Sequence, residues 1–307
     1  MPAAQPPRLL AVVGPTASGK TALGLNLAQH YQGAVISADS RQVYAGMNIG
    51  TAKSPQAWAH EAHSPQQADI VEGIPHYLFN VCAPDTRYTL ATWKADATHV
   101  IDRLHAAQIP ALLVGGTMLY IDSVMFGYEL PPVPPNDHFR QTLIAQDTDA
   151  LYRELLTRDP AATFVEPHNK RRIIRALEVM EATGKPFSQL RRQRVPPSPD
   201  CWLGLFPGWE QLRDNVTRRV EEMLDAGLVE EVARLVEYYG EALPLLQTLN
   251  YKQGLALLQG QISREAAAMS MIAATMRYAH RQMSWWKNNK QIHWLTGIEA
   301  LHLKSLD

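Results

Sequence analysis

The chain has 307 residues, with 29 lysine and arginine and 30 aspartate and glutamate side chains, so its formal net charge is −1. This length suffices for one large domain with an appendage, and the neutral balance means that a nucleic-acid partner requires a local basic patch. The two cysteines, Cys82 and Cys201, are too few for a disulfide framework and lack metal-ligand spacing, which favours a reducing compartment.

Residues 1–7 are rich in proline and have no apolar core, so we expect no signal peptide. The longest apolar stretch, 109–125, contains two glycines and Asp122, and it predicts a strand followed by a helix rather than a membrane span. We expect a cytoplasmic protein without a membrane segment, and we also expect a monomer.

An apolar run at 9–13 is followed by GPTASGKT at 14–21 and then by a helical pattern at 22–28. Strand, glycine-rich loop and helix form the context in which G-x-x-x-x-G-K-[ST] binds phosphate. Converging backbone N–H groups, the helix dipole and the lysine supply positive charge, and the Thr21 hydroxyl can bind Mg²⁺, the expected cofactor. The loop predicts a di- or triphosphate site; the alternative is an ordinary glycine turn before a core helix.

A second buried strand is predicted at 33–38, with Asp39 at or just past its carboxyl end. In doubly wound sheets this edge is where ligands bind. A carboxylate beside a phosphate loop can cap a helix, bind Mg²⁺ or act as a general base, and spacing alone leaves these three roles open.

Residues 54–74 are polar and irregular and predict a solvated loop. His60 and His63 have no third metal ligand nearby in this loop. Apolar patterns predict a strand at 75–81 and a helix at 88–108.

The next buried strand, 109–117, ends in Gly115-Gly116-Thr117. A nucleoside triphosphatase usually has an acidic residue at this point, which holds Mg²⁺ through water. Thr117 can instead present a hydroxyl to a ligand at the sheet edge, or it can simply cap the helix that runs to Met125.

Four prolines within 131–135 predict a stiff linker, and a second proline cluster closes the segment at 196–199. Helices are expected between the clusters at 139–158 and 170–183. A concentration of basic side chains favours contact with RNA or DNA over an ordinary solvated face. These basic residues include Arg171 and Arg175, which share a helix face, and Lys185, Arg191, Arg192 and Arg194.

The last third predicts a strand at 202–206, one helical stripe over 211–239, a helix over 263–287 and a strand at 292–295. The 263–287 helix is expected to bury Met269, Ile272, Met276, Ala279, Met283 and Trp286, and to expose a basic strip of Arg277, His280 and Arg281.

Seven motifs occur in an order that closely resembles the bacterial tRNA dimethylallyltransferases, or tRNA isopentenyl transferases, from about residue 8 to residue 295. The motifs are GPTASGKT at 14–21, ADSRQVY at 38–44, GTAK at 50–53, Pro75-His76, LVGGTMLY at 113–120, RALEV at 175–179 and Arg281-Gln282. Each motif is moderately specific, and the ordered set is very specific.

The resemblance implies an α/β fold, a doubly wound and mainly parallel P-loop core at 1–129 and 198–307. A helical insertion at 130–197 is expected to grip the tRNA anticodon arm. The implied reaction transfers a dimethylallyl group from dimethylallyl diphosphate to the N6 amine of the adenosine 3′-adjacent to the anticodon.

Matched positions imply roles for individual residues. Asp39 is the general base, and Thr117 positions the amine. The diphosphate side comprises Gly14, Thr16, Ala17, Ser18, Gly19, Lys20, Thr21 and Arg219. The tRNA side comprises Ser40, Arg41, Gln42, Lys53, Arg171, Arg175, Arg191, Arg192, Arg194, Arg277 and Arg281.

The chain departs from the family pattern at several positions. Asn215-Val216 replaces an Arg-Ile pair, Asn80 replaces an aspartate, and Met276 and His280 replace basic residues. The 54–74 loop is also longer than typical. Alternative functions are prenylation of a free adenine nucleotide, a small-molecule P-loop kinase and a non-enzymatic RNA-binding protein.

Overall fold

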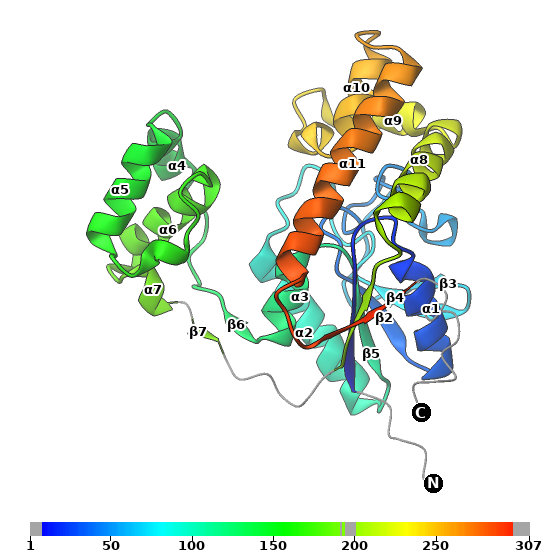
Figure 1. The fold of residues 1–307 in the computed structure, drawn as a ribbon, viewed down its shortest axis with the longest axis horizontal. Helices are drawn as coiled ribbons and strands as arrows, with labels where there is room; N and C mark the ends of the chain where they lie inside the picture. The colour runs from blue at the N-terminus through cyan, green and yellow to red at the C-terminus, as the bar shows by residue number, and fades with distance from the viewer. Residues whose placement is uncertain (1–7, 191, 194–200, 297–307) are drawn as a thin grey trace. The chain divides into compact units, whose positions relative to one another are not determined.

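The computed structural model describes residues 8–190, 192–193 and 201–296 (Figure 1). The chain divides into a larger unit, Met1–Met125 with Pro197–Asp307, and a smaller unit, Phe126–Pro196. None of the helices in the described ranges is both long and apolar enough to cross a membrane.

The larger unit contains a seven-stranded sheet in the order β3-β4-β2-β5-β1-β8-β9. All neighbouring strands are parallel except β3 and β4. This arrangement confirms the predicted mainly parallel α/β core. The strands are β1 (Leu9–Val13), β2 (Ala34–Ser37), β3 (Asp69–Val71), β4 (Ile74–Tyr77), β5 (Ala111–Val114), β8 (Cys201–Leu205) and β9 (Ile292–Leu295).

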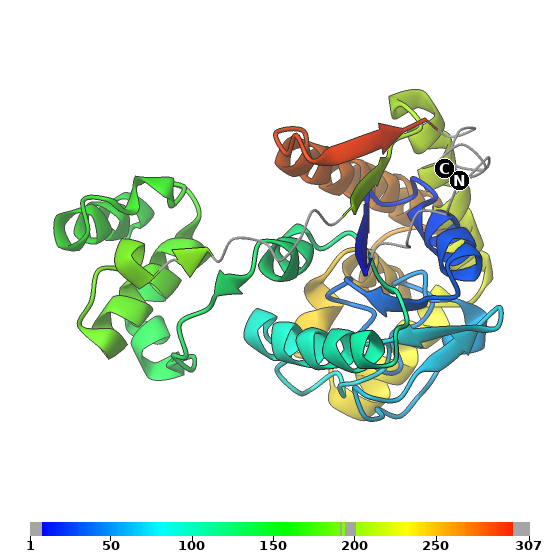
Figure 2. The same ribbon diagram turned by 90° about the horizontal axis from the view of Figure 1, so that it is seen from below.

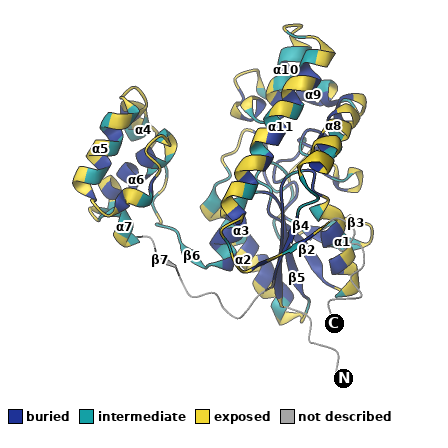
Figure 3. Ribbon diagram, in the orientation of Figure 1, coloured by how far each residue is buried: buried dark blue, intermediate teal, exposed yellow. Residues whose placement is uncertain are grey.

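Helices cover both faces of this sheet, and Figure 2 shows α1 on the opposite face from α2 and α3. Because both faces are covered, strands such as β1 are continuous apolar runs, buried at every residue. Figure 3 shows the buried strands between helices whose outer faces are exposed. The helices are α1 (Lys20–His30), α2 (Leu90–Ala106), α3 (Met118–Met125), α8 (Trp209–Asp225), α9 (Leu228–Tyr239), α10 (Tyr251–Leu258) and α11 (Arg264–Trp286).

The smaller unit is helical and has its own core. Its helices are α4 (Asp137–Ile144), α5 (Thr148–Arg158), α6 (Lys170–Thr183) and α7 (Phe187–Leu190), with a short ribbon of β6 (Tyr128–Glu129) and β7 (Arg192–Gln193). Leu151, Leu155 and Leu177 are fully buried in this core. The buried carboxylate of Glu178 accepts from the Arg140 and Arg175 side chains at 2.8 and 2.6 Å. Burial opposes ionisation, but these hydrogen bonds outweigh it and lower the pKa of Glu178 to about 2.

Three expected elements are wrong in detail. The helix predicted at 139–158 is two helices, because the Asp147 side chain accepts from Ala150 N at 3.0 Å and caps a new start. The stripe at 211–239 is also two helices, interrupted at Gly227, whose φ is 96°. The loop at 54–74 contains β3 and a 3-10 turn, η1 (Pro55–Ala57).

The buried face of α11 agrees with the predicted one at Met276, Ala279 and Trp286 and differs from it elsewhere. Met269 is 66% exposed, whereas the polar side chains of Thr275 and Gln282 are buried. The apolar pattern did not show that these two side chains are buried, because hydropathy assigns amide and hydroxyl side chains to solvent. The residues buried on α11 are Ala267, Ala268, Met271, Thr275, Met276, Ala279, Gln282 and Trp286.

A buried carboxylate on α9 fixes the backbone that follows the Asp39 segment. Glu231 is 1% exposed and accepts from the N–H groups of Asn48, Ile49 and Gly50 at 2.9, 2.8 and 3.1 Å. It also accepts from the Tyr251 hydroxyl at 2.7 Å. Four donors satisfy one buried charge, which joins residues 48–50 to α9 and α10.

We expect Glu231→Ala to lower the free energy of unfolding by about 3 kcal/mol or more, because buried N–H groups lose their acceptor. Urea unfolding monitored by circular dichroism measures this change. Glu230→Ala, on the exposed side of the same helix turn, is the matched control and is expected to change stability by less than about 0.5 kcal/mol. Equal effects of the two substitutions would contradict the anchoring role.

Candidate active site

The glycine-rich loop lies between β1 and α1, as its sequence predicts. Gly14, Ala17 and Gly19 have φ values of 149°, 63° and 96°, and α1 begins at Lys20. The Ser18 hydroxyl is buried and has no hydrogen-bond partner within the described part of the chain. An unpaired buried hydroxyl at a helix start is suited to an incoming phosphate oxygen.

Two cations meet beside this loop. Lys20 Nζ donates to Pro15 O at 3.2 Å, and burial followed by repulsion from Arg219 lowers the pKa of Lys20 to about 8. Burial also lowers the pKa of Arg219, which projects from α8. Lys20 and Arg219 are both half-buried. Holding two positive charges together where water is partly excluded is unfavourable until an anion binds, so this side of the site is suited to an anionic ligand.

Asn215 also contacts the loop. Its Nδ2 donates to Ala17 O at 3.1 Å, and its Oδ1 accepts from Arg218 Nη2 at 3.1 Å. The side chain therefore braces the loop through a neutral amide, where the family resemblance implies a further cation.

Asp39 and Thr117 lie together at the carboxyl edge of the sheet, although 78 positions separate them in sequence. The Thr117 hydroxyl accepts from Ser40 N at 2.9 Å, and Thr117 N donates to Ala38 O at 3.0 Å. Asp39 Oδ1 accepts from Arg41 N at 2.8 Å. Asp39 thus closes a tight turn rather than capping a helix, and Thr117 binds this same turn.

The side chains of Arg41 and Gln42 also bond within this segment. Arg41 Nη1 donates to Ser40 O at 3.1 Å, and Gln42 Nε2 donates to Thr51 O at 3.1 Å. Gln42 Oε1 accepts from the Ser37 hydroxyl at 2.9 Å. Both residues are half-buried, and their assignment to tRNA binding stays a prediction.

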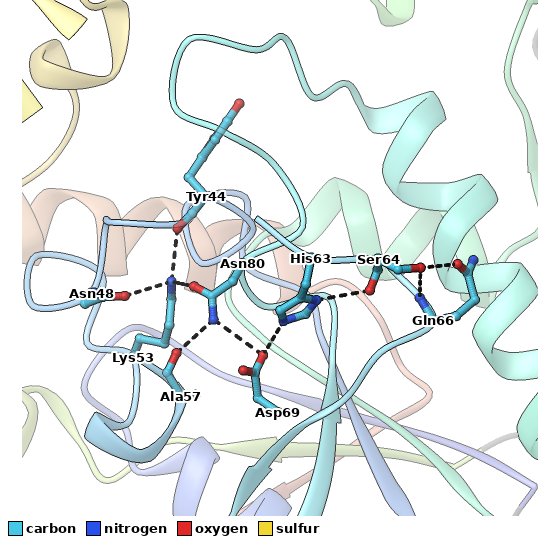
Figure 4. A network of polar contacts seen from close by, with 9 residues as sticks. All are labelled: Tyr44, Asn48, Lys53, Ala57, His63, Ser64, Gln66, Asp69 and Asn80. Atoms are coloured by element: carbon cyan, nitrogen blue, oxygen red, sulfur yellow. Dashed lines mark hydrogen bonds and ion pairs between the residues drawn. The ribbon is translucent and has the colours of Figure 1, made fainter. Parts of the chain in front are cut away.

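The predicted role of Lys53 in tRNA binding is wrong. Lys53 is 3% exposed and its ammonium donates to Tyr44 O at 3.0 Å, to Asn48 Oδ1 at 3.2 Å and to Asn80 Oδ1 (Figure 4). Burial lowers the pKa of Lys53 to about 7. Because all three donors point to protein oxygens, Lys53 holds the segment together instead of facing a polyanion.

The same network extends into the 54–74 segment. Asn80 Nδ2 contacts Asp69 Oδ2 at 3.4 Å, and the same carboxylate oxygen lies 3.0 Å from His63 Nε2 (Figure 4). His63 is therefore a partner of Asp69 in a polar network rather than half of a His-x-x-His metal site.

The basic residues predicted to contact tRNA have different environments. Arg171 is exposed, but Arg175 donates to Glu178 at 2.6 Å and to Val133 O at 2.9 Å and therefore acts within the smaller unit. Arg192 lies in β7, and Arg191 and Arg194 lie outside the described residues.

On α11, Arg277 and Arg281 are exposed, and the Arg281 guanidinium lies 5.5 Å from the centre of the Tyr278 ring. His280 stacks on Trp209 with ring centres 3.9 Å apart. Met276 is 7% exposed. The position at which the family resemblance implies a basic residue therefore faces the core in this chain.

Two polar side chains of α11 reach the site and were not predicted as site residues. Tyr278 donates to Gly116 O at 3.1 Å, and Gln282 donates to the same oxygen at 2.8 Å. The available signal for Gln282 was the Arg281-Gln282 motif. The Tyr278 position carried no comparable signal.

Within the described ranges, no group of three or more His, Cys, Asp or Glu side chains can hold a metal ion. A Mg²⁺ ion bound mainly through phosphate oxygens and water needs only one or two protein ligands. Thr21, exposed in the first turn of α1, is a suitable hydroxyl donor for such an ion, so the residues present fit Mg²⁺ that arrives with a diphosphate.

Comparison with known proteins agrees with this geometry. The IPP transferase family model matches residues 42–289, and the isopentenyl transferase model matches residues 7–62. The chain belongs to the IPP transferase family. As a member of this family, it is a transferase.

Similar proteins include a tRNA dimethylallyltransferase of Synechocystis sp., which is 40% identical over 99% of this chain and 95% of its own length. A tRNA isopentenylpyrophosphate transferase of Bacillus halodurans is 32% identical, covers 94% of this chain and 89% of its own, and has a TM-score of 0.66. A eukaryotic dimethylallyltransferase acting on tRNA is 26% identical, with 97% of this chain and 76% of its own covered and a TM-score of 0.79.

The lowered pKa of Lys20 predicts how diphosphate affinity depends on pH. With a pKa of about 8 in the ligand-free protein, Lys20 is mostly charged at pH 7 and mostly neutral at pH 9. Relative to Lys20→Arg, which stays charged, the wild type should lose about tenfold in affinity for inorganic diphosphate between pH 7 and pH 9. Titration calorimetry on both proteins measures this ratio, and a constant ratio would show that the Lys20 charge does not bind the ligand.

Proposed function

We propose that this chain transfers a dimethylallyl group from dimethylallyl diphosphate to the N6 amine of the adenosine next to the anticodon of tRNA. The observation that carries the proposal is the meeting of a cationic diphosphate loop with the Asp39–Thr117 pair at one edge of the sheet. The names of the family relatives support a tRNA substrate.

The diphosphate side is suited to leaving-group stabilisation. When the C1–O bond of the allylic substrate breaks, its electron pair goes to the diphosphate, which gains negative charge. Lys20, Arg219 and the N–H groups at the start of α1 would stabilise that charge. Mg²⁺, held by Thr21 and the diphosphate oxygens, would add further positive charge when bound.

The acceptor side supplies a place for the proton. As the amine nitrogen forms its bond to C1, it gives up one proton, and Asp39 is the carboxylate available to accept it. The hydrogen bond from Arg41 N holds one oxygen of the Asp39 carboxylate and thereby fixes the orientation of that carboxylate. Thr117, fixed by Ser40 N, lies beside this carboxylate and positions the amine.

Contacts to the RNA backbone are assigned to the exposed basic side chains on both units. Arg171 on α6 and Arg277 and Arg281 on α11 are exposed and have no acidic partner among the ion pairs of the described residues. Phosphate contacts from such side chains position RNA without reading its sequence. This assignment gives the smaller unit the role of holding the anticodon arm.

The decisive assay incubates the protein with labelled dimethylallyl diphosphate and either tRNA or free adenine nucleotides. Label in tRNA supports the proposal, whereas label only in free nucleotide identifies a different acceptor. A parallel incubation with labelled ATP and small acceptors tests for kinase activity, which the proposal excludes.

Asp39→Asn should keep the turn, because the amide oxygen can still accept from Arg41 N, but it cannot accept a proton. We expect kcat to fall by at least about 100-fold, with tRNA affinity and melting temperature unchanged. Single-turnover kinetics together with a tRNA binding assay measure these quantities. Near-normal turnover in Asp39→Asn would show that Asp39 is not the general base.

Arg171→Gln and Arg175→Gln should have different effects. Loss of one phosphate contact at Arg171 should weaken tRNA binding and reduce the salt slope of log Kobs by about one, without a change in melting temperature. Loss of Arg175 should instead destabilise the smaller unit, because Glu178 is 2% exposed and loses a charged partner. If Arg171→Gln binds tRNA with wild-type affinity, Arg171 does not contact the RNA, and the strip of Arg277 and Arg281 is the next candidate for the contact.

A further inference from the structure

One side chain of α11 joins the two halves of the candidate site. Gln282 Oε1 accepts from Thr16 N in the diphosphate loop at 2.8 Å, and Gln282 Nε2 donates to Gly116 O at 2.8 Å. Thr16 lies 266 positions from Gln282 in sequence, and Gly116 lies 166 positions from it. A single planar amide therefore connects the loop that binds the diphosphate to the residue that precedes Thr117.

The bridge is rigid and closely packed. Gln282 is fully buried. A Cβ atom on residue 116 would lie 2.4 Å from Gln282 Nε2, so the close approach requires glycine at this position. Because both ends of a buried amide are paired, neither end can move without leaving an unsatisfied polar group, which fixes the distance between the two loops.

A second side chain reinforces the acceptor end alone. Tyr278, one turn earlier on α11, donates to Gly116 O at 3.1 Å. The Gly116 carbonyl thus accepts from two α11 side chains. The next residue along the chain is Thr117, whose hydroxyl belongs to the acceptor side of the site. Among the hydrogen bonds of the described residues, those of Tyr278 reach only the acceptor side, whereas those of Gln282 reach both the acceptor side and the diphosphate loop.

We infer that Gln282 is a positioning residue for the transfer step. It sets the separation between the diphosphate loop and the Asp39–Thr117 pair, so that the allylic carbon and the amine meet at reacting distance. This inference rests on the proposed function. Displacement of reacting groups by about 1 Å can cost about 100-fold in rate, which makes the length of this bridge consequential.

The experiment compares three substitutions on α11. Gln282→Met keeps the length and volume but removes both hydrogen bonds. Tyr278→Phe removes the hydroxyl that donates to Gly116 O and interacts with the Thr117 side chain, both on the acceptor side. Thr275→Val is the matched control, because Thr275 is buried on the same helix and has no role assigned in the site. For each protein we measure kcat, the tRNA Kd, the Kd of inorganic diphosphate and the melting temperature.

The expected pattern separates positioning from simple stabilisation. Gln282→Met should lower kcat by about 30-fold or more. It should also raise the Kd of inorganic diphosphate by about fivefold, which is the effect of one lost hydrogen bond. Tyr278→Phe should lower kcat by about fivefold and leave diphosphate binding unchanged. The tRNA Kd should be constant in both variants, and Thr275→Val should match the wild type in kcat and in both binding constants.

Other outcomes overturn the inference. Unchanged kcat in Gln282→Met, or a loss of diphosphate affinity in Tyr278→Phe equal to that in Gln282→Met, would show that the bridge does not connect the two loops. If Gln282→Met does not fold, equal kcat values for Tyr278→Phe and Thr275→Val overturn the positioning role. If the wild type transfers no dimethylallyl group, the proposed function fails, and the diphosphate titrations alone decide whether Gln282 supports the loop.

Discussion

The approach of two parallel strand ends at Ala38 and Gly115 is the constraint on which the site depends. A Cβ atom on residue 115 would lie 2.2 Å from Ala38 O, so this contact is possible only between backbone atoms. Ala38 O then accepts from Thr117 N at 3.0 Å, which aligns the two segments beyond β2 and β5. Because β1 pairs with β5, the diphosphate loop that follows β1 opens at the same edge.

Along this carboxyl edge of the sheet, positive and negative side chains lie in two separate regions. Lys20 and Arg219 form a positive side beside the loop, and β5 leads into glycines and Thr117 rather than into an acidic residue. A P-loop for phosphoryl transfer places a metal-holding acid at this position, whereas departure of an intact diphosphate requires only positive charge and N–H donors. In the proposed reaction, the carboxylate of Asp39 instead serves the acceptor side, where the proton is released.

Local patterns predicted the parts whose conformation is local. The glycine-rich loop, the buried strands and the place of Asp39 after β2 follow from short apolar runs and loop residues, and the structure has them. Failures occurred where distant partners decide burial. Lys53 is enclosed by oxygens of Tyr44, Asn48 and Asn80, and Gln282 is buried because two loops meet on it. A single sequence shows these residues as polar and gives no sign of their partners.

The buried Lys53 and the half-buried Lys20 show why residue type alone does not assign function. Burial lowers the pKa of both Lys20 and Lys53, to about 8 and about 7. The ammonium of Lys53 has its three donors directed to protein oxygens, so its charge is solvated internally and it stabilises the 44–80 segment. Lys20 bonds to one carbonyl, at 3.2 Å; Arg219 repels its charge, and Asp39 attracts it more weakly. An anion would accept from its remaining donors and offset the repulsion from Arg219. This difference in partners suits Lys53 to a structural role and Lys20 to the proposed binding of a ligand.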